Sequence, residues 1–318
     1  MASRWRRAFG GVEEVGVITA LLLLSLVFTL TTDTFFTLDN LVKVARQASD
    51  YGLMAAGMVF VLTLGEVDLS VGSVLTLVNV VTAVALREGL PPAAALFLGL
   101  LTGAACGFAN GALCVFLRIP TIIVTLGSMS IFRGLALVVS KATPVSQFGK
   151  DNFIFQGLGG EVFRVPASVA AMALLGAGSH VLLHHTVFGR RVQAIGSNIQ
   201  AARFSGISIA RYRIAVMTLS GTLAAVAGIL ALAFLGSADP KTGEGSELLV
   251  IASAVIGGTA LSGGSGTILG AILGALIIAV IRNGLVLLGF TAYWNQSVIG
   301  AMIIAAVAVD YFIKKRRA

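Results

Sequence analysis

Two carboxylates interrupt an almost wholly apolar stretch, and this interruption constrains the fold more than any other feature of the chain. Residues 65–73 read GEVDLSVGS and separate two hydrophobic runs, 51–64 and 74–86. Charge at membrane depth is costly and usually functional. The segment is therefore either a tight turn or non-helical backbone inside the membrane, which is tolerated only against protein or a water-filled cavity. This pattern favours a chain that solutes pass through, so transport is the leading hypothesis.

The composition is that of a membrane protein. Hydrophobic residues make up 57% of the 318 and charged residues only 11%, with a mean hydropathy of +0.97. A soluble domain carries roughly 25% charged residues. The 38 glycines fit the same class, because small residues let membrane helices approach closely. We expect an all-α, polytopic protein in which residues 1–318 form a single transmembrane domain.

Allowing about 20 apolar residues for each span, the sequence predicts about ten transmembrane helices. They fall near residues 16–31, 51–65, 70–87, 93–117, 121–140, 166–185, 213–236, 247–262, 266–282 and 295–313. The first apolar run exceeds the roughly 7–15 residues of a secretory signal, and no small-x-small cleavage site follows it. We therefore expect it to be an uncleaved span.

Basic residues gather before the first span, after the last span, and in a loop over about 186–212. The positive-inside rule puts all three in the cytoplasm, including both termini. The predicted outer loops are mixed in sign, and one of them holds Lys43, Arg46 and Asp50. The net charge of +8 thus reflects topology beside anionic lipid, and no nucleic-acid partner is expected.

The sequence offers no set of residues for catalysis. Residues 261–265 read LSGGS, like the signature loop of ABC ATPases, but the chain has no Gly-x-x-x-x-Gly-Lys-Ser/Thr phosphate loop. No cofactor or metal site is expected either. If ATP drives transport here, the ATPase is another polypeptide.

One nine-residue pattern occurs twice. Gly-x-x-x-Leu-Ser-x-Gly-Ser spans residues 65–73 and again 257–265. Repeated glycine-rich helix breaks point to a transport site, although chance matches arise easily in so glycine-rich a chain. With the predicted spans, both copies face the cytoplasm.

Among the polar residues at membrane depth, Glu66 and Asp68 are the strongest candidates for a functional role. Their carboxylates could accept hydrogen bonds from a hydroxylated solute or bind a proton or cation. Asp68 could instead cap the helix that begins near Ser70. Arg133 lies deep in its span and should face the bundle interior toward Glu66 or Asp68, as an ion pair or a solute contact.

Asn79 is expected either to tie helices together or to contact solute. The candidate translocation pathway comprises Glu66, Asp68, Ser70, Asn79 and Arg133.

The basic loop also carries apolar residues that a merely solvated loop does not need. They are Ile195, Ile199, Phe204 and Ile207. Apolar residues on a basic segment suggest docking against a partner or lipid.

Several segments resemble the permease subunits of monosaccharide ABC importers, the ribose-type branch. Residues 65–73 resemble that family's GGIDLSVGS, and Glu66 departs from its second glycine. Further matches are 125–134 (TLGSMSIFRG), 144–146 (PVS), 189–198 (GRRVQAIGSN), 257–259 (GGT) and 263–266 (GGSG). The resemblance runs from about residue 38 to 310.

The resemblance implies a type II ABC importer-like permease of the bacterial inner membrane. Two permease copies, or this chain and a related one, would form the pore. Two cytoplasmic ABC ATPase subunits would drive it, and a periplasmic substrate-binding protein would deliver the sugar.

The resemblance also implies an ATPase-coupling element in the basic loop. Ala201, Ala202 and Gly206 match the family's Ala-Ala-x-x-x-Gly, and Arg190 and Arg203 lie in the same loop. The alternative from another class is an ion-coupled secondary transporter that uses Glu66 and Asp68 and needs no ATPase. A channel or purely structural membrane protein is the third reading.

Overall fold

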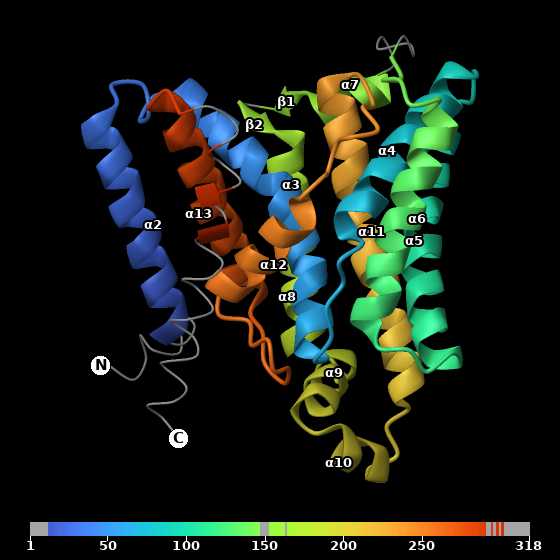
Figure 1. Ribbon diagram of the computed structural model, residues 1–318. Helices are drawn as coiled ribbons and strands as arrows, with labels where there is room; N and C mark the ends of the chain where they lie inside the picture. The colour runs from blue at the N-terminus through green and yellow to red at the C-terminus, as the bar shows by residue number, and fades with distance from the viewer. Residues whose placement is uncertain are drawn as a thin grey trace.

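The computed structural model is a helical bundle with one short β-hairpin (Figure 1). It describes residues 12–146, 153–162 and 164–290, together with 294, 297–298 and 300–301. The helices are α2 (Val12–Thr31), α3 (Leu38–Thr63), α4 (Val71–Arg87), α5 (Pro92–Phe116), α6 (Thr121–Ser140), α7 (Phe153–Gly159), α8 (Ala167–His184), α9 (Val187–Ser197), α10 (Ile199–Phe204), α11 (Ile209–Leu235), α12 (Ser246–Ile256) and α13 (Ile268–Leu287). Strands β1 (Glu161–Val162) and β2 (Val165–Pro166) pair antiparallel.

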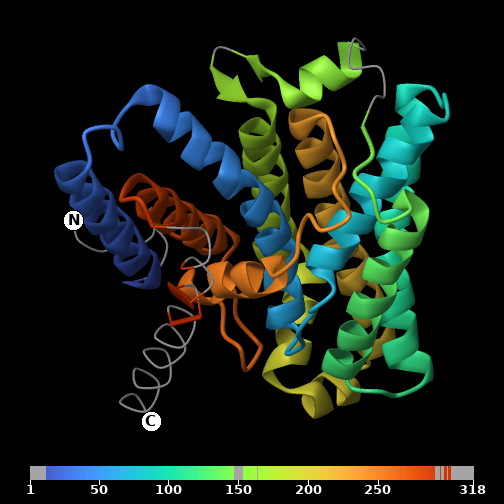
Figure 2. The same ribbon diagram turned by 45° about the horizontal axis from the view of Figure 1, so that its top comes forward.

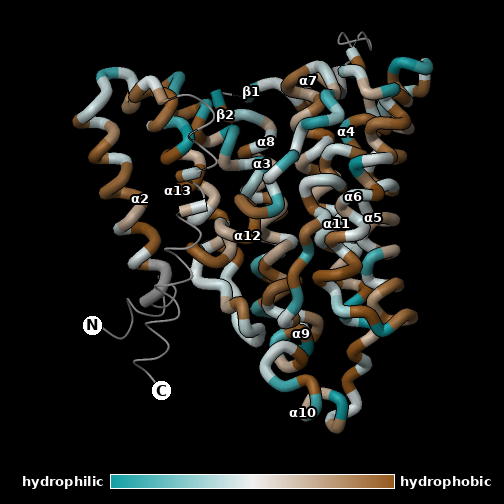
Figure 3. Tube along the Cα trace, viewed as in Figure 1, coloured by the Kyte–Doolittle hydropathy of each residue, from teal (hydrophilic) through white to brown (hydrophobic). Residues whose placement is uncertain are grey.

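The described chain contains five helices that are long and apolar enough to cross a membrane, namely α5, α6, α8, α11 and α13. Hydrophobic residues also line the outside of the bundle along α2, α5 and α6 (Figure 3). Leu30, Phe97 and Val138 on these three helices are all exposed. Apolar surface of this extent fits a lipid environment and confirms a polytopic membrane protein.

Most predicted spans agree with the helices, and α6 has the predicted bounds. The span predicted at 247–262 is wrong, because α12 ends at Ile256 and has 11 residues. Its length of roughly 16 Å is short of the ~30 Å hydrocarbon core. Gly257 and Gly258 end the helix, and Gly258 has a φ of +91° that disfavours a helical continuation. The span predicted at 295–313 lies largely outside the described residues.

The start of α3 also differs from the prediction. Lys43, Arg46 and Asp50 were expected in a loop, but α3 begins at Leu38 and carries all three on its first turns. The opposite side of these turns is apolar, with Val44 and Ala48 buried. An amphipathic helix fits this position because one face packs while the other stays polar.

Small residues bring α5 and α11 into close contact. A Cβ added at Gly103 would lie 2.5 Å from both the Ala225 Cβ and the Gly221 carbonyl oxygen. Only glycine fits at such a separation. The abundance of glycine therefore serves helix packing, as the composition predicted.

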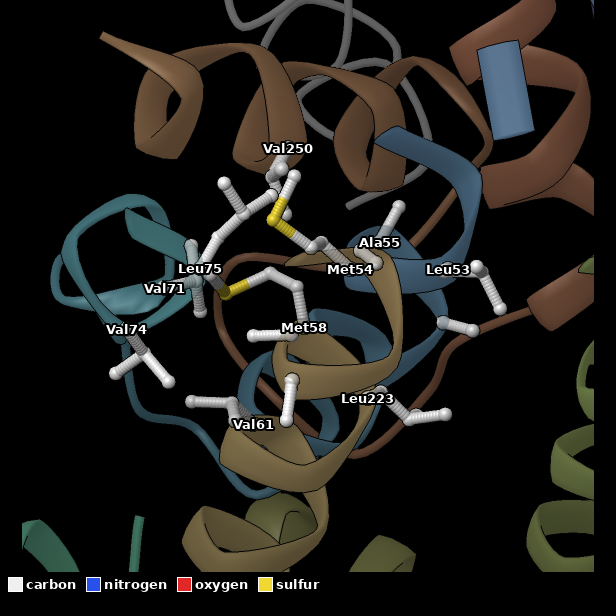
Figure 4. Close-up of a cluster of buried hydrophobic side chains, with 14 of the residues drawn as sticks. Leu53, Met54, Ala55, Met58, Val61, Val71, Val74, Leu75, Leu223 and Val250 are labelled. Carbon is white, nitrogen blue, oxygen red and sulfur yellow. The ribbon is translucent and has the colours of Figure 1, made fainter. Parts of the chain in front are cut away.

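The core lies where α3, α4, α11 and α12 meet (Figure 4). At one end of the bundle lie α9 and α10, and at the other lie α7 and the β-hairpin (Figures 1 and 2). Both views place the short α12 between these ends. Three connections shape the interior: residues 64–70 between α3 and α4, 236–245 between α11 and α12, and 257–267 between α12 and α13.

Candidate functional site

The break between α3 and α4 is built by a tight turn at Gly65. Gly65 has a φ of +86°, and its N–H donates to the Leu62 carbonyl oxygen at 2.8 Å. Glycine adopts this left-handed conformation without the steric cost of a Cβ. The turn ends α3 and directs the following residues back into the bundle, where α4 begins at Val71.

Both carboxylate oxygens of Asp68 accept hydrogen bonds from other residues of the protein. Its Oδ1 accepts hydrogen bonds from the Ser70 N–H at 2.8 Å and the Ser70 hydroxyl at 2.6 Å. Its Oδ2 accepts from the Ser220 hydroxyl of α11 at 3.2 Å. Ser70, not Asp68, is the N-cap residue of α4. Asp68 therefore stabilises the turn that leads into the helix and ties it to α11.

The buried network extends from Asp68 to α5. The Asn110 side-chain amide donates to the Ser70 hydroxyl oxygen at 2.8 Å. The Asn110 Oδ1 is buried and has no hydrogen-bond partner among the described residues. Asp68, Ser70, Asn110 and Ser220 thus join α4, α5 and α11 into one polar cluster. Buried networks of this kind hold elements in a fixed arrangement.

Glu66 pairs with Arg213, the first residue of the span predicted at 213–236. Its Oε1 accepts a hydrogen bond from the Arg213 guanidinium, and the two form an ion pair between the break and α11. Oε2 of Glu66 is buried without a hydrogen-bond partner in the described chain. The ion pair therefore links the break to α11.

Arg133 does not face Glu66 or Asp68, so that prediction is wrong. Its Nη1 lies 3.6 Å from the Oε1 of Glu244, which belongs to the 236–245 connection. Arg133 is twelve residues beyond the start of α6, and the helical rise of about 1.5 Å per residue lifts it well past the level of the break. Its partner therefore comes from the connection that enters the bundle from the opposite end.

Asn79 links two helices. Its side-chain amide donates to the Gly228 carbonyl oxygen of α11 at 3.3 Å, and the residue is wholly buried. This contact matches the helix-tying alternative for Asn79.

The two copies of the nine-residue pattern touch each other. The Gly264 N–H donates at 2.8 Å to the carbonyl oxygen of Thr63, two residues before the first copy. A Cβ added at Gly263 would lie 2.9 Å from the Gly65 Cα. Both copies form turns at the α9 end of the bundle, and their glycines allow the two backbones to meet.

The last turn of α9 fits against this pair of turns. A Cβ on Gly196 would overlap the Thr63 carbonyl oxygen and lie 2.6 Å from the Gly264 nitrogen. We call the contact of Thr63, Gly196 and Gly264 the backbone junction. It joins the segment α9–α10 to both helix breaks without an intervening side chain.

Side-chain caps shape α9 and α10. The Thr186 hydroxyl accepts from the Gly189 N–H at the start of α9. The Asn198 carboxamide oxygen accepts from the N–H groups of Gln200 and Ala201 at 3.0 Å and begins α10. Gly206 follows α10 with a φ of +76°. Such caps satisfy the free N–H groups of helix termini.

The residues expected to couple to an ATPase lie together on α9, α10 and the turn that follows. Ala202 is buried, whereas Arg190, Ala201, Arg203 and Gly206 are exposed. Of the apolar residues in this segment, Ile195 is buried and Ile207 packs against the core, but Ile199 is 45% and Phe204 90% exposed. The segment thus presents apolar and basic side chains to its surroundings.

Apolar outer faces, broken helices and a protruding basic segment define a membrane transport protein. Residues 40–307 match the family described as "Branched-chain amino acid transport system / permease component". The chain belongs to this family of permease components, and the resemblance seen in the sequence is confirmed. It is not an enzyme, since ATP hydrolysis in such transporters lies in a partner subunit.

Curated relatives cover nearly the whole chain. The probable ABC transporter permease protein YphD of Escherichia coli K12 is 40% identical over 305 residues, or 96% of this chain and 91% of that protein. The ribose import permease protein RbsC of Bacillus subtilis is 39% identical, covering 95% and 94%. The D-allose transport system permease protein AlsC of E. coli K12 is 36% identical, covering 95% and 93%. No solved structure gave a significant match.

Proposed function

We propose that this chain is the permease of an ATP-driven importer that moves a monosaccharide or a similar polyhydroxylated solute into the cytoplasm. Its similarity to a ribose import permease and a D-allose transport permease supports this substrate class. The observation that carries the ATP-driven mechanism is the backbone junction. Through it, the exposed segment α9–α10 touches both helix breaks inside the bundle.

In this mechanism the ATPase binds the exposed residues of α9–α10, with Phe204 as the apolar anchor and Arg190 and Arg203 as basic contacts. Movement of the bound ATPase shifts α9, and the backbone junction passes the shift to α3 and to the α12–α13 connection. Direct backbone contact suits this role, because close-packed protein has low compressibility and transmits a displacement to its neighbours. The loop 186–212 is therefore proposed as the coupling loop within a single permease domain, 1–318.

The proposed topology places α9–α10 in the cytoplasm. The start of α2 lies at the same end of the bundle (Figure 1), which supports a cytoplasmic N-terminus. The C-terminus, with its basic residues, is assigned to the same side by the positive-inside rule. The end that carries α7 and the β-hairpin then faces the periplasmic binding protein. A second permease copy or a related chain completes the pore within the lipid of the inner membrane.

The contacts of the two carboxylates argue against the ion-coupled alternative. Glu66 is paired with Arg213, and Asp68 accepts three hydrogen bonds from Ser70 and Ser220. A coupling-ion site needs carboxylate oxygens that are free to take up and release the ion. These two groups instead hold the break in place.

The assembly is tested by purification from the native membrane in mild detergent, with a tag on the chain. An ABC ATPase recovered in stoichiometric amount is the expected result, and the associated binding protein can then be screened against sugars. Recovery of the chain alone, still able to support solute uptake in liposomes without ATP, would overturn the proposal.

A further inference from the structure

A cavity of about 380 Å³ opens between α3, α4, α11, α12 and α13. It is lined by the first turns of α3, the last turn of α11 and the connection before α12. Figure 1 shows that α3 begins and α11 ends at the end of the bundle opposite α9–α10. The volume falls within the range of small-molecule sites, roughly 300–1,000 Å³.

Polar side chains of α3 form one wall of the cavity. Lys43, Gln47, Asp50 and Tyr51 all line it. Their spacing of three and four residues places them on one face of the helix. Gln47 and Asp50 are half-buried, and neither side chain makes a hydrogen bond to any residue that the structure describes. The Arg46 guanidinium acts on the Asp50 carboxylate electrostatically. Polar groups within a membrane bundle are costly, so an amide and a carboxylate on a cavity wall whose hydrogen-bonding capacity is unused point to an external hydrogen-bonding partner.

The neighbouring polar groups are fixed. Arg46 forms an ion pair of 3.0 Å with Glu161 of β1, and its guanidinium lies 3.8 Å from the centre of the Phe234 ring. Tyr51 accepts a hydrogen bond from Arg282 of α13. These contacts hold the wall rigid around Gln47 and Asp50. A preorganised wall lowers the cost of ordering a ligand.

The floor of the cavity is apolar. Met54 and Leu75, both buried, form it. Figure 4 shows Met54, Met58, Leu75 and Val250 gathered together, from α3, α4 and α12. Met58 lies one turn beyond Met54 toward the end of α3, so this apolar layer lies between the cavity and the break after α3.

We infer that this cavity is the site where the permease receives its solute, with Asp50 and Gln47 as the specificity-determining contacts. The inference rests on the proposed function. Sugar hydroxyls donate to the Asp50 carboxylate and exchange hydrogen bonds with the Gln47 amide, while the apolar side of the sugar ring lies on Met54 and Leu75. The apolar layer below is the barrier that must open for release toward α9–α10.

Glu66, Asp68 and Ser70 then have a structural role below the barrier. None of them lines the cavity. The solute contacts predicted at the helix break are thus replaced by a polar stripe about four turns earlier on α3.

The test uses the whole complex, with the copurifying ATPase and binding protein, in right-side-out membrane vesicles. D-ribose, D-allose and D-xylose serve as radiolabelled probes, and the one imported by the wild type is used for the variants. Asp50→Asn and Gln47→Ala should each lower its uptake about tenfold, with the ATPase still copurifying. Asp39→Asn is the matched control, because Asp39 is exposed on the same helix outside the cavity, and its uptake should stay at the wild-type level.

The possible outcomes distinguish an error in the cavity assignment from an error in the proposed substrate class. Uptake by Asp50→Asn and Gln47→Ala equal to the wild type overturns the cavity assignment alone. A wild type that imports none of the three sugars overturns the proposed substrate class, and the cavity assignment falls with it.

A second measurement covers variants that fail to assemble. The only native cysteines, Cys106 and Cys114, are buried, so Gln47→Cys can be labelled with a membrane-impermeant maleimide against a low background. Labelling from outside should be slowed at least about twofold by the imported sugar. Leu90→Cys, in the exposed turn after α4, should label without protection. Labelling of Gln47→Cys that the sugar leaves unchanged contradicts the inference.

Discussion

Glu66 accepts a hydrogen bond from the side chain of Arg213, so an ion pair joins the break after α3 to the beginning of α11. The sequence suggested a different partner for Glu66, because Arg133 lies deep within its predicted span. Arg213 reaches it instead, since α11 begins at Ile209, four residues before the predicted start. This pair ties α11 to the break that α9 contacts at the backbone junction.

Removing one partner of this pair should destabilise the permease. The Glu66 side chain is 9% and that of Arg213 25% exposed, so Glu66→Gln should cost about 2 kcal/mol by leaving the guanidinium without its counter-charge. Thermal unfolding of the purified variant should show a lower Tm. The double variant Glu66→Gln/Arg213→Gln should recover part of the loss. A single variant as stable as the wild type would show that the pair contributes nothing.

The backbone junction predicts an unusual cost for a very small substitution. Gly196→Ala should lower both stability and uptake, because its Cβ would overlap the Thr63 carbonyl oxygen. Gly178→Ala on α8 is the control, since nothing lies within 4 Å of its Cβ. In a helix interior, alanine is favoured over glycine by about 1 kcal/mol, so the control should be neutral or slightly stabilised. Uptake and Tm measured on both variants check the prediction; equal behaviour of the two would contradict it.

Gly206 should be needed for coupling. A bulky residue at its φ of +76° is strained and shifts the end of α10. For Gly206→Val we expect ATP hydrolysis by the complex to continue while uptake falls about tenfold. Gly89→Val carries the same strain at a φ of +88° in the turn after α4, far from α10, and should transport normally. Unchanged transport by Gly206→Val would contradict the proposed coupling role of this segment.

Phe204 should anchor the ATPase. It is 90% exposed at the end of α10, and an aromatic side chain there supplies apolar area to a partner. Phe204→Ser should reduce the amount of ATPase that copurifies by about tenfold. Phe36→Ser is matched, because Phe36 is also largely exposed but lies between α2 and α3. Equal ATPase recovery from both variants would count against α10 as the docking surface.

Local signals in the sequence were sufficient for the regular spans. For α6, Pro120 stands before the first turn and Lys141 adopts a left-handed conformation after the last, so the apolar run and the helix share their bounds. The family was also evident from the sequence, because its motifs lie at turns such as Gly65 and at the capped segment 189–198, where backbone geometry restricts the residue type.

Tertiary partners were not evident from the sequence. The partner of Arg133 is Glu244, which lies more than a hundred residues away in a connection whose path depends on α12 being short. Hydropathy alone counted α12 as a span, since it registers apolar content but not the end imposed by Gly257 and Gly258.

The polar residues of α3 that line the cavity have a recognisable spacing in the sequence, but averaged hydropathy does not show it. Lys43, Gln47 and Asp50 recur at helical spacing, yet these polar residues lowered the mean hydropathy and suggested a loop. A search for helical periodicity of polar residues beside an apolar run would have extended α3 to its observed start.

ATP-driven sugar import is measured directly by uptake of radiolabelled D-ribose, D-allose and D-xylose into proteoliposomes. The liposomes contain this chain with its copurifying ATPase, and the binding protein is supplied outside. If ATP drives the import, at least one sugar should accumulate only with ATP inside, and a protonophore should leave the uptake unchanged. Accumulation that needs no ATP and collapses with the protonophore would contradict ATP-driven import and return Glu66 and Asp68 to the role of an ion site.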